Sequence, residues 1–276
     1  MPLAVCATPI GNLEDVTLRV LDELRAADLV LCEDTRRTAI LLARHEIRAR
    51  ELLSNHEHNE SARVAEIMPR LLAGARVALV SDAGIPGIND PGGRLVREAL
   101  GAAVPVTVLP GASAVETALV ASGLPAEQYR FLGYLPRRAV ELAELWAELR
   151  HWPHPAVAFE SPKRLGSSLA SLASTDPGRV VAVCRELTKL HEEVVVGTAV
   201  ELAKRFPEGT RGEVTIVIGA AEGGIDEDGE AMAGALAAVA SLVGAGSPRR
   251  VAVDVVASLT GVPRKLLYDR SLPPGN

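Results

Sequence analysis

Short runs of consecutive apolar residues recur along the first part of the chain, separated by stretches of helical length. Runs this apolar are typical of strands buried on both faces of a sheet. The expected strands are Leu3–Ala7, Leu29–Cys32, Arg76–Val80 and Val106–Leu109. The expected helices between them include Thr17–Ala26, Asn59–Ala73 and Gly92–Ala103. This alternation predicts βαβ units and a mainly parallel sheet covered by helices on both faces.

Apolar runs and helical stretches continue beyond residue 120, and the pattern changes there. The expected strands are Phe131–Tyr134, Ala156–Phe159, Val180–Cys184, Val194–Val196 and Val214–Ile218. Helices are expected near Arg137–Arg150 and Pro162–Ser174. We therefore predict an N-terminal α/β domain at residues 1–119 and a C-terminal α/β domain at residues 120–221, the second with more antiparallel pairing.

The last quarter of the chain begins with EGGIDEDGE, residues 222–230, whose five acids and three glycines predict an acidic, solvated linker. Past it the pattern turns helical, so residues 231–276 are expected to form a small helical extension. Ser247 is expected to cap a helix with Pro248 as its first residue. The turn TGVP and a helix opened by Pro263 complete a helix-turn-helix-like pair. Such a pair is either a helical cap or a nucleic-acid contact.

Composition narrows the protein classes. The chain has 276 residues, of which 48% are hydrophobic, enough for two packed domains. No apolar run has the length needed to cross a bilayer, and the N-terminus lacks the order of a signal peptide, so we expect a soluble cytoplasmic protein without membrane contact. The net charge of −6 argues against indiscriminate nucleic-acid binding over the whole surface. From Ser247 onward, however, the sequence has five basic residues and two acidic residues.

Residues that often bind metals are few and badly spaced. Cys6, Cys32 and Cys184 are far apart, each in an apolar run, so we expect buried small side chains rather than disulfides or zinc ligands. His56 and His58 are two residues apart, which is wrong for one face of a helix, and they are expected in a solvated loop. We expect no metal site.

Three loops rich in small residues follow expected strands of the first domain. They are TPIGN at 8–12, SDAGIPGINDPGG at 81–93 and PGASA at 110–114. Small residues let a ligand approach the backbone closely, and the carboxyl ends of parallel strands meet at one edge of a sheet. We therefore expect a shared ligand crevice. The sequence lacks G-x-x-x-x-G-K-[ST], G-x-G-x-x-G after the first strand, and G-x-S-x-G, which disfavours an ATP site, the usual dinucleotide fold and an esterase.

Clusters of mixed charge also follow expected strands. They are CEDTRRT at 32–38, FESPKRL at 159–165 and CRELTKLHEEVVVGT at 184–198. The first places Glu33 and Asp34 beside Arg36 and Arg37. Each cluster is either a solvated group of ion pairs or part of a functional site.

The run ATPIGNLEDVTLRVLDELRAADLVLCEDTRRT, residues 7–38, resembles the start of the bacterial ribosomal RNA small subunit methyltransferase I family of the tetrapyrrole methylase superfamily. The likeness continues in order through LVSDAGIPGINDPG, VLPGASA, FLGYLPR, FESPKRL, CRELTKLHEE and GEVTIVI, and spans residues 3 to about 219. The resemblance implies two α/β domains with S-adenosylmethionine in the cleft between them, and a homodimer. It also implies 2′-O-methylation of a cytidine ribose in 16S rRNA, in the decoding region of the small ribosomal subunit.

The resemblance also implies site residues. The expected cofactor contacts, to which Gly11 is added because its backbone can approach a ligand closely, are Pro9, Gly11, Asp82, Gly84, Ile85, Ser113, Ala114, Phe159 and Val214. A ribose hydroxyl is a poor nucleophile, so a base is expected. The candidates for that base are Glu33, Asp34 and Glu160. The cations expected to partner phosphate or carboxylate groups are Arg36, Lys163, Arg185 and Lys189.

Two other functions share part of this pattern. A methylase of a small macrocycle such as a precorrin shares fold and cofactor with the family. However, the first loop here reads TPIGN instead of the more usual G-x-G-x-G-D, which disfavours a tetrapyrrole substrate. A non-catalytic RNA-binding assembly protein, built around the C-terminal helices, predicts affinity for RNA and none for S-adenosylmethionine.

Overall fold

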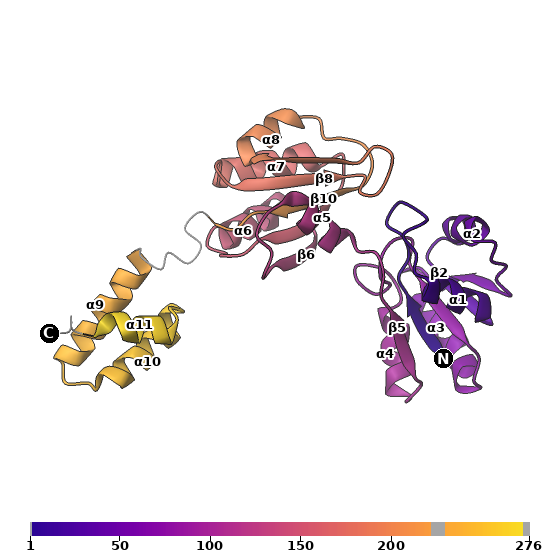
Figure 1. Cartoon of the computed structure of the whole chain (residues 1–276), viewed down its shortest axis with the longest axis horizontal. Helices are drawn as coiled ribbons and strands as arrows, with labels where there is room; N and C mark the ends of the chain where they lie inside the picture. The colour runs from indigo at the N-terminus through magenta and orange to yellow at the C-terminus, as the bar shows by residue number, and fades with distance from the viewer. Residues whose placement is uncertain (1, 222–229, 273–276) are drawn as a thin grey trace. The chain divides into compact units, whose positions relative to one another are not determined.

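The computed structural model describes residues 2–221 and 230–272, and the chain divides into two compact units, Met1–Ala221 and Glu222–Asn276 (Figure 1). The larger unit carries two five-stranded sheets with helices α1–α8, and the smaller one consists of helices α9–α11. The predicted acidic linker lies outside the described residues up to position 229, and its last residue, Glu230, already opens α9.

The first sheet is parallel throughout. Its strands are β1 (Leu3–Cys6), β2 (Leu29–Cys32), β3 (Leu52–Ser54), β4 (Val77–Val80) and β5 (Val106–Leu109). They lie in the order β3-β2-β4-β1-β5, and every neighbouring pair is parallel. The predicted mainly parallel sheet is therefore confirmed. The apolar pattern missed β3, because this strand has only three residues and all of them are half-buried.

Helices cover both faces of this sheet, as predicted. They are α1 (Leu18–Ala26), α2 (Thr35–Arg44), α3 (Glu60–Leu72) and α4 (Gly93–Gly101). Side chains of β1 alternate between the two layers: Ala4 and Cys6 pack with residues of α1 and α2, whereas Leu3 and Val5 pack with residues of α3 and α4. Because these strands are buried on both faces, their sequences are unbroken apolar runs.

The connections that follow the neighbouring strands β1 and β4 run to opposite faces of the first sheet. The chain leaves β1 toward β2 in one direction and leaves β4 toward β5 in the other, although β1 and β4 are neighbours. In open α/β sheets, ligands bind beyond the carboxyl ends of the strands, near the point where successive connections change face. The loops that begin at Ala7 and Ser81 are the ones that leave this point.

The second sheet is mostly antiparallel. Its strands are β6 (Arg130–Tyr134), β7 (Ala156–Glu160), β8 (Val180–Arg185), β9 (Glu193–Thr198) and β10 (Val214–Ile218), in the order β6-β7-β10-β8-β9. Only β6 and β7 pair in parallel, so the predicted shift toward antiparallel pairing is confirmed. Its helices are α5 (Ala114–Ser122), α6 (Ala139–Leu149), α7 (Leu165–Thr175) and α8 (Ala199–Arg205).

Helix α5 connects the two sheets. It follows β5 of the first sheet, yet its apolar residues Val115, Ala118 and Leu119 pack with Val157 and Val217 of the second. The other face of the second sheet packs against α6, α7 and α8. The predicted boundary between residues 119 and 120 falls inside α5.

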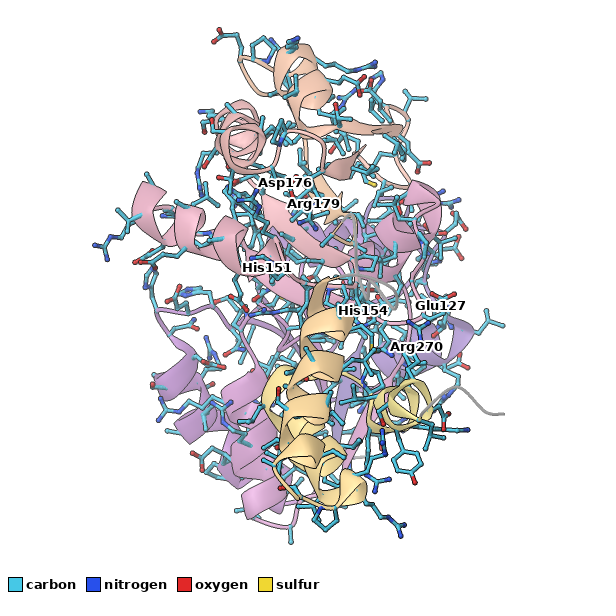
Figure 2. The ribbon with its side chains drawn as sticks, turned by 90° about the vertical axis from the view of Figure 1, so that its left-hand side faces the viewer. Glu127, His151, His154, Asp176, Arg179 and Arg270 are labelled. Atoms are coloured by element: carbon cyan, nitrogen blue, oxygen red, sulfur yellow. The ribbon has the colours of Figure 1, made fainter. Side chains whose placement is uncertain are left out.

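A buried arginine organises the end of the second sheet at which β8 begins. Arg179 is 3% exposed, and its guanidinium donates to the carbonyls of Leu149 and Gly219, each at 3.0 Å. It also bonds the Asp176 carboxylate at 2.8 Å, and the two side chains lie together in Figure 2. Three elements are therefore joined at this end, and the opposite end of the sheet is the one that faces a cavity.

Three helices form the smaller unit around their own apolar cluster: α9 (Glu230–Gly244), α10 (Arg249–Thr260) and α11 (Arg264–Ser271). The tight turn between α10 and α11 is confirmed, and Gly261 adopts φ +74° there. The predicted start of α10 is wrong by one residue. Pro248 rather than Ser247 is the cap, because the Pro248 carbonyl accepts the first helical bonds, from the N–H groups of Val251 and Ala252.

The three cysteines are buried and free, as expected. Burial raises the pKa of Cys6 and of Cys184 to about 12, so neither thiol is a nucleophile at neutral pH. Within residues 2–221 and 230–272, no helix is long and apolar enough to cross a membrane. The same described residues contain no group of three or more histidine, cysteine, aspartate or glutamate side chains placed to hold a metal ion.

Candidate active site

A cavity of about 470 Å³ lies at the carboxyl ends of the first-sheet strands, and its other wall comes from the second sheet. The first wall consists of the loops after β1, β2, β4 and β5, and the second consists of the ends of β6, β7 and β8 with the start of β10. Seven of the nine predicted cofactor positions line it: Asp82, Gly84, Ile85, Ser113, Ala114, Phe159 and Val214. Segments separated by more than a hundred residues are thus brought to one site.

Backbone hydrogen bonds hold the first two loops together at the crevice. The N–H of Thr8 donates to the carbonyl of Gly84 at 2.9 Å, and the N–H of Gly84 donates to the carbonyl of Thr8 at 3.0 Å. The Thr8 hydroxyl also donates to the Ser81 carbonyl at 3.0 Å. Gly84 adopts φ +76°, a conformation that favours glycine. The loop after β4 can therefore turn back onto the loop after β1 with little backbone strain.

The remaining two predicted cofactor positions, Pro9 and Gly11, line an adjoining hollow of about 170 Å³. Gly11 is needed for packing. A Cβ on Gly11 would lie 2.6 Å from Lys189 Cγ and from Thr188 Oγ1, and 2.8 Å from the Leu187 carbonyl oxygen. The absence of a side chain at Gly11 thus lets the loop after β1 pack closely against the segment after β8.

Three carboxylates from two loops meet at the cavity. Glu33 follows β2, Asp82 follows β4, and Asp90 lies eight residues further along the same loop. Burial, together with the charges of Glu33 and Asp82, raises the pKa of Asp90 to about 7. Burial also raises the pKa of Glu33, and the charge of Asp82 adds to this rise. Asp90 can therefore exchange a proton near neutral pH.

A chain of ion pairs crosses from the first wall to the second. Arg37 on α2 contacts Asp82 at 3.1 Å and Glu213, just before β10, at 3.5 Å. Lys189 contacts Glu213 at 2.9 Å and Glu186 at 2.8 Å. These pairs engage the two cations with carboxylates of the protein itself, so Lys189 lies beside the site as a neighbour of the adjoining hollow.

Asp34 and Arg36 have a local structural role at the start of α2. The Asp34 carboxylate accepts from the N–H of Arg36 at 2.8 Å, which makes Asp34 the N-cap. The Arg36 guanidinium bonds the same carboxylate, and these hydrogen bonds lower the pKa of Asp34 to about 2. The Arg36 side chain is 88% exposed. Asp34 stays close to the site through its backbone N–H, which donates to Asp82 at 3.0 Å.

The second wall combines aromatic rings with a buried acid. Phe159 at the end of β7 packs edge to face with Tyr134 at the end of β6, with ring centroids 5.5 Å apart. Glu160 is 3% exposed, and its carboxylate accepts from the Ser161 N–H at 2.6 Å and from the Ser168 hydroxyl at 2.5 Å. Both oxygens of Glu160 are therefore occupied by structural donors.

Sequence reasoning missed two residues of this site. Asp90 lies inside the predicted loop at 81–93, but its carboxylate environment depends on Glu33 and Asp82, which no local pattern reveals. Tyr134 was predicted as the last residue of a strand. Its place in the cavity depends on a register shift between β6 and β7, which interrupts the regular alternation of side chains. The available signals were its aromatic identity near the end of a strand and its place in the motif FLGYLPR.

Comparison with known proteins identifies the family. The family described as tetrapyrrole (corrin/porphyrin) methylases matches residues 2–203 of the chain. The chain belongs to this family. It is a methyltransferase fold in which the matched segment includes both sheets except β10.

Relatives in sequence are similar over nearly the whole methylase. A "Ribosomal RNA small subunit methyltransferase I" from Micromonospora olivasterospora is 42% identical, with 99% of this chain and 90% of that protein covered. A protein of the same name from Mesorhizobium japonicum is 40% identical over 98% of this chain and 91% of its own length. One from Thermotoga maritima is 42% identical over 221 residues, which cover 80% of this chain and 99% of that protein. That length equals the length of the first compact unit.

Solved structures share the methylase fold. A diphthine synthase matches with a TM-score of 0.64 at 16% identity, covering 79% of this chain and 89% of its own. A uroporphyrin-III C-methyltransferase from Thermus thermophilus, complexed with S-adenyl homocysteine, matches with a TM-score of 0.52 at 20% identity, covering 79% of this chain and 96% of its own.

Proposed function

We propose that this methylase transfers a methyl group from S-adenosylmethionine to the 2′-hydroxyl of a cytidine ribose in the 16S rRNA of the small ribosomal subunit. The observation that carries the proposal is full-length similarity to proteins named ribosomal RNA small subunit methyltransferase I. The cavity supports it independently, because seven of the positions that the family pattern assigns to the cofactor lie around one space.

The cavity residues suit S-adenosylmethionine. A volume of about 470 Å³ is in the range of pockets that take small molecules. Ala83 and Ala114 have small side chains that leave room for a nucleoside, and Asp82 supplies the negative charge that favours a cationic ligand. When bound, this cofactor supplies a methyl group carried on a positively charged sulfur. The protein contributes mainly by holding donor and acceptor in line at contact distance.

Asp90 is the group best placed to accept the proton of the ribose hydroxyl. Its carboxylate lines the cavity, and with a pKa of about 7 it is partly ionised at neutral pH and basic enough to draw a proton. Glu33 lies in the same wall and keeps the pKa of Asp90 high by its charge. Asp34 is a weaker base because its pKa is about 2, and Glu160 already accepts two hydrogen bonds.

The charge of the cavity favours a nucleoside over a macrocycle. Glu33, Asp82, Asp90 and Glu213 line it, together with Arg37, which pairs with Asp82 and Glu213. A precorrin carries carboxylate groups around its rim, which these side chains repel. A ribose and its base are neutral, and they can enter while the RNA phosphates stay outside. A purely RNA-binding assembly protein has no use for a buried acidic cavity of this size.

The proposal includes a homodimer that acts in the cytoplasm, where small ribosomal subunits are found. In this proposal the helices α9–α11 are accessory to methyl transfer, because an alignment of 221 residues covers 99% of the Thermotoga maritima relative. Sedimentation of the full chain tests the dimer. A monomer at all concentrations contradicts that part alone.

The decisive experiment is methyl transfer to small ribosomal subunits that lack the modification. Full-length protein is incubated with tritiated S-adenosylmethionine, and the RNA is digested to nucleosides. We expect the label in 2′-O-methylcytidine, and a strong loss of label with Asp90→Asn. Label in a base carbon or nitrogen contradicts the ribose as acceptor. Binding of the cofactor with transfer only to a precorrin supports the macrocycle methylase, and failure to bind the cofactor supports the assembly protein.

A further inference from the structure

Aromatic side chains are scarce in this chain and gather beside the cavity. The sequence contains three phenylalanines, three tyrosines and two tryptophans in 276 residues. Three of these eight, Phe131, Tyr134 and Phe159, form one contact group with Phe159 at its centre, at centroid distances of 5.2 Å to Phe131 and 5.5 Å to Tyr134. Phe131 and Phe159 are partly buried in an apolar cluster, whereas Tyr134 is 65% exposed.

An irregularity in β6 gives Tyr134 its position. Phe131 pairs with Val157 and Tyr134 pairs with Phe159, so three steps along β6 match two steps along β7. In a regular strand, residues three apart point to opposite faces. The extra residue lets both Phe131 and Tyr134 reach the ring of Phe159. Gly133 supports this bulge with φ +70°, a conformation that favours glycine.

Tyr134 faces the acidic wall of the cavity from the opposite sheet. Burial raises the pKa of its hydroxyl, and the charges of Asp90, Glu213 and Glu33 add to this rise. The amide of Asn89, the residue before Asp90, lies next to Gly133: a Cβ on Gly133 would be 3.1 Å from Asn89 Oδ1. An exposed ring therefore stands beside a side-chain amide and the carboxylate proposed as the base.

Contact geometry leaves this ring available to a planar partner. The Tyr134 and Phe159 planes meet at 62°, an edge contact rather than a face-to-face stack. An exposed aromatic ring at the edge of a cavity offers a face on which a nucleic-acid base can stack. RNA-modifying proteins reach unpaired nucleotides by stacking the extruded base on such rings and by reading its edge with amides.

From these contacts we propose that Tyr134 is the stacking platform for the unpaired base of the nucleotide to be methylated. This rests on the proposed function, because it names how that site holds its RNA substrate. The base lies against the Tyr134 ring, the Asn89 amide offers a donor and an acceptor to the base edge, and the attached ribose is directed toward Asp90. Tyr134 is thus a binding residue for the acceptor and takes no part in proton transfer.

The test distinguishes the contribution of the aromatic ring from that of the hydroxyl and from that of an apolar side chain without a ring. Full-length Tyr134→Phe, Tyr134→Leu and Tyr134→Ala are compared with wild type in methyl transfer to unmodified small ribosomal subunits. Val140→Ala is the matched control, since Val140 is also 65% exposed and lies on α6, outside the cavity lining. Calorimetry with S-adenosylhomocysteine measures the cofactor site separately.

We expect Tyr134→Leu and Tyr134→Ala to lower kcat/KM for the subunit about 10- to 100-fold, the value of one base stack. Tyr134→Phe is expected to lose less than threefold, and S-adenosylhomocysteine affinity should change less than twofold in all variants. Full activity of Tyr134→Leu overturns the proposal, as does a loss in Tyr134→Phe equal to that in Tyr134→Ala. A parallel loss of S-adenosylhomocysteine affinity assigns the ring to the cofactor and also overturns it. If wild type itself transfers no methyl to the subunit, the proposed function fails, and this proposal fails with it.

Discussion

Replacement of Asp90 with asparagine is expected to stabilise the fold at alkaline pH while it removes most methyl transfer. The side chain has nearly the same shape, but it carries no charge beside Glu33 and Asp82. A rise of the Asp90 pKa from 3.8 to about 7 corresponds to at most about 4 kcal/mol. Asp90 is half-buried, and solvent screening reduces the expected gain to about 1–2 kcal/mol.

The sign of this effect follows from the protons bound in each state. Between pH 3.8 and about 7 the unfolded chain has lost the Asp90 proton while the folded chain still holds it, so wild-type stability falls as pH rises. Above pH 7 both states are ionised and the full penalty is present. The gain from Asp90→Asn is therefore largest at pH 8.5 and small at pH 4.5.

Urea unfolding of the full chain at these two pH values measures the gain, with the exposed Asp15→Asn as a control that keeps the cavity intact. Methyl transfer by Asp90→Asn is expected to fall about 10²- to 10⁴-fold, the usual loss when a general base is removed. A stability change that is the same at both pH values refutes the account of the cluster. Unimpaired transfer refutes the role of Asp90 as the base.

Three further substitutions test other parts of the structure. Asp34→Ala should cost about 1 kcal/mol of stability in urea unfolding through loss of the α2 N-cap, whereas Asp34→Asn keeps the cap and should retain more than a tenth of the methyl transfer rate. A larger loss in Asp34→Asn would show a direct catalytic role. Gly11→Ala forces a Cβ to within 2.6 Å of Lys189 Cγ and should cost about 1–3 kcal/mol, measured as a lower Tm. Glu23→Ala removes the 2%-exposed partner of Arg76 and should cost about 2 kcal/mol in urea unfolding; no change would show that Arg76 is satisfied by solvent alone.

Local sequence patterns predict the parts of this fold that are determined by residues close together in the sequence. The apolar strands, the parallel first sheet and the small-residue loops followed from runs of a few residues. Strand β3 was missed because three half-buried residues carry no periodicity. Asp34 was grouped with the functional acids, although an aspartate directly before a helix is also the common N-cap. Asp90 and Tyr134 could not be predicted, since the surroundings that define them come from other loops and from a bulge.

The apolar clusters under α1–α4 and α6–α8 consist mainly of strand and helix residues, whereas the cluster under α5 also includes Ile10 of the first loop. Glu33, Asp82 and Asp90 lie on loops that follow strands, and Tyr134 is the last residue of β6. Substitutions at these positions can therefore alter the accepted molecule at little cost to folding. One scaffold can in this way diversify across unrelated acceptors, from macrocycles to polynucleotides, without inventing a new architecture.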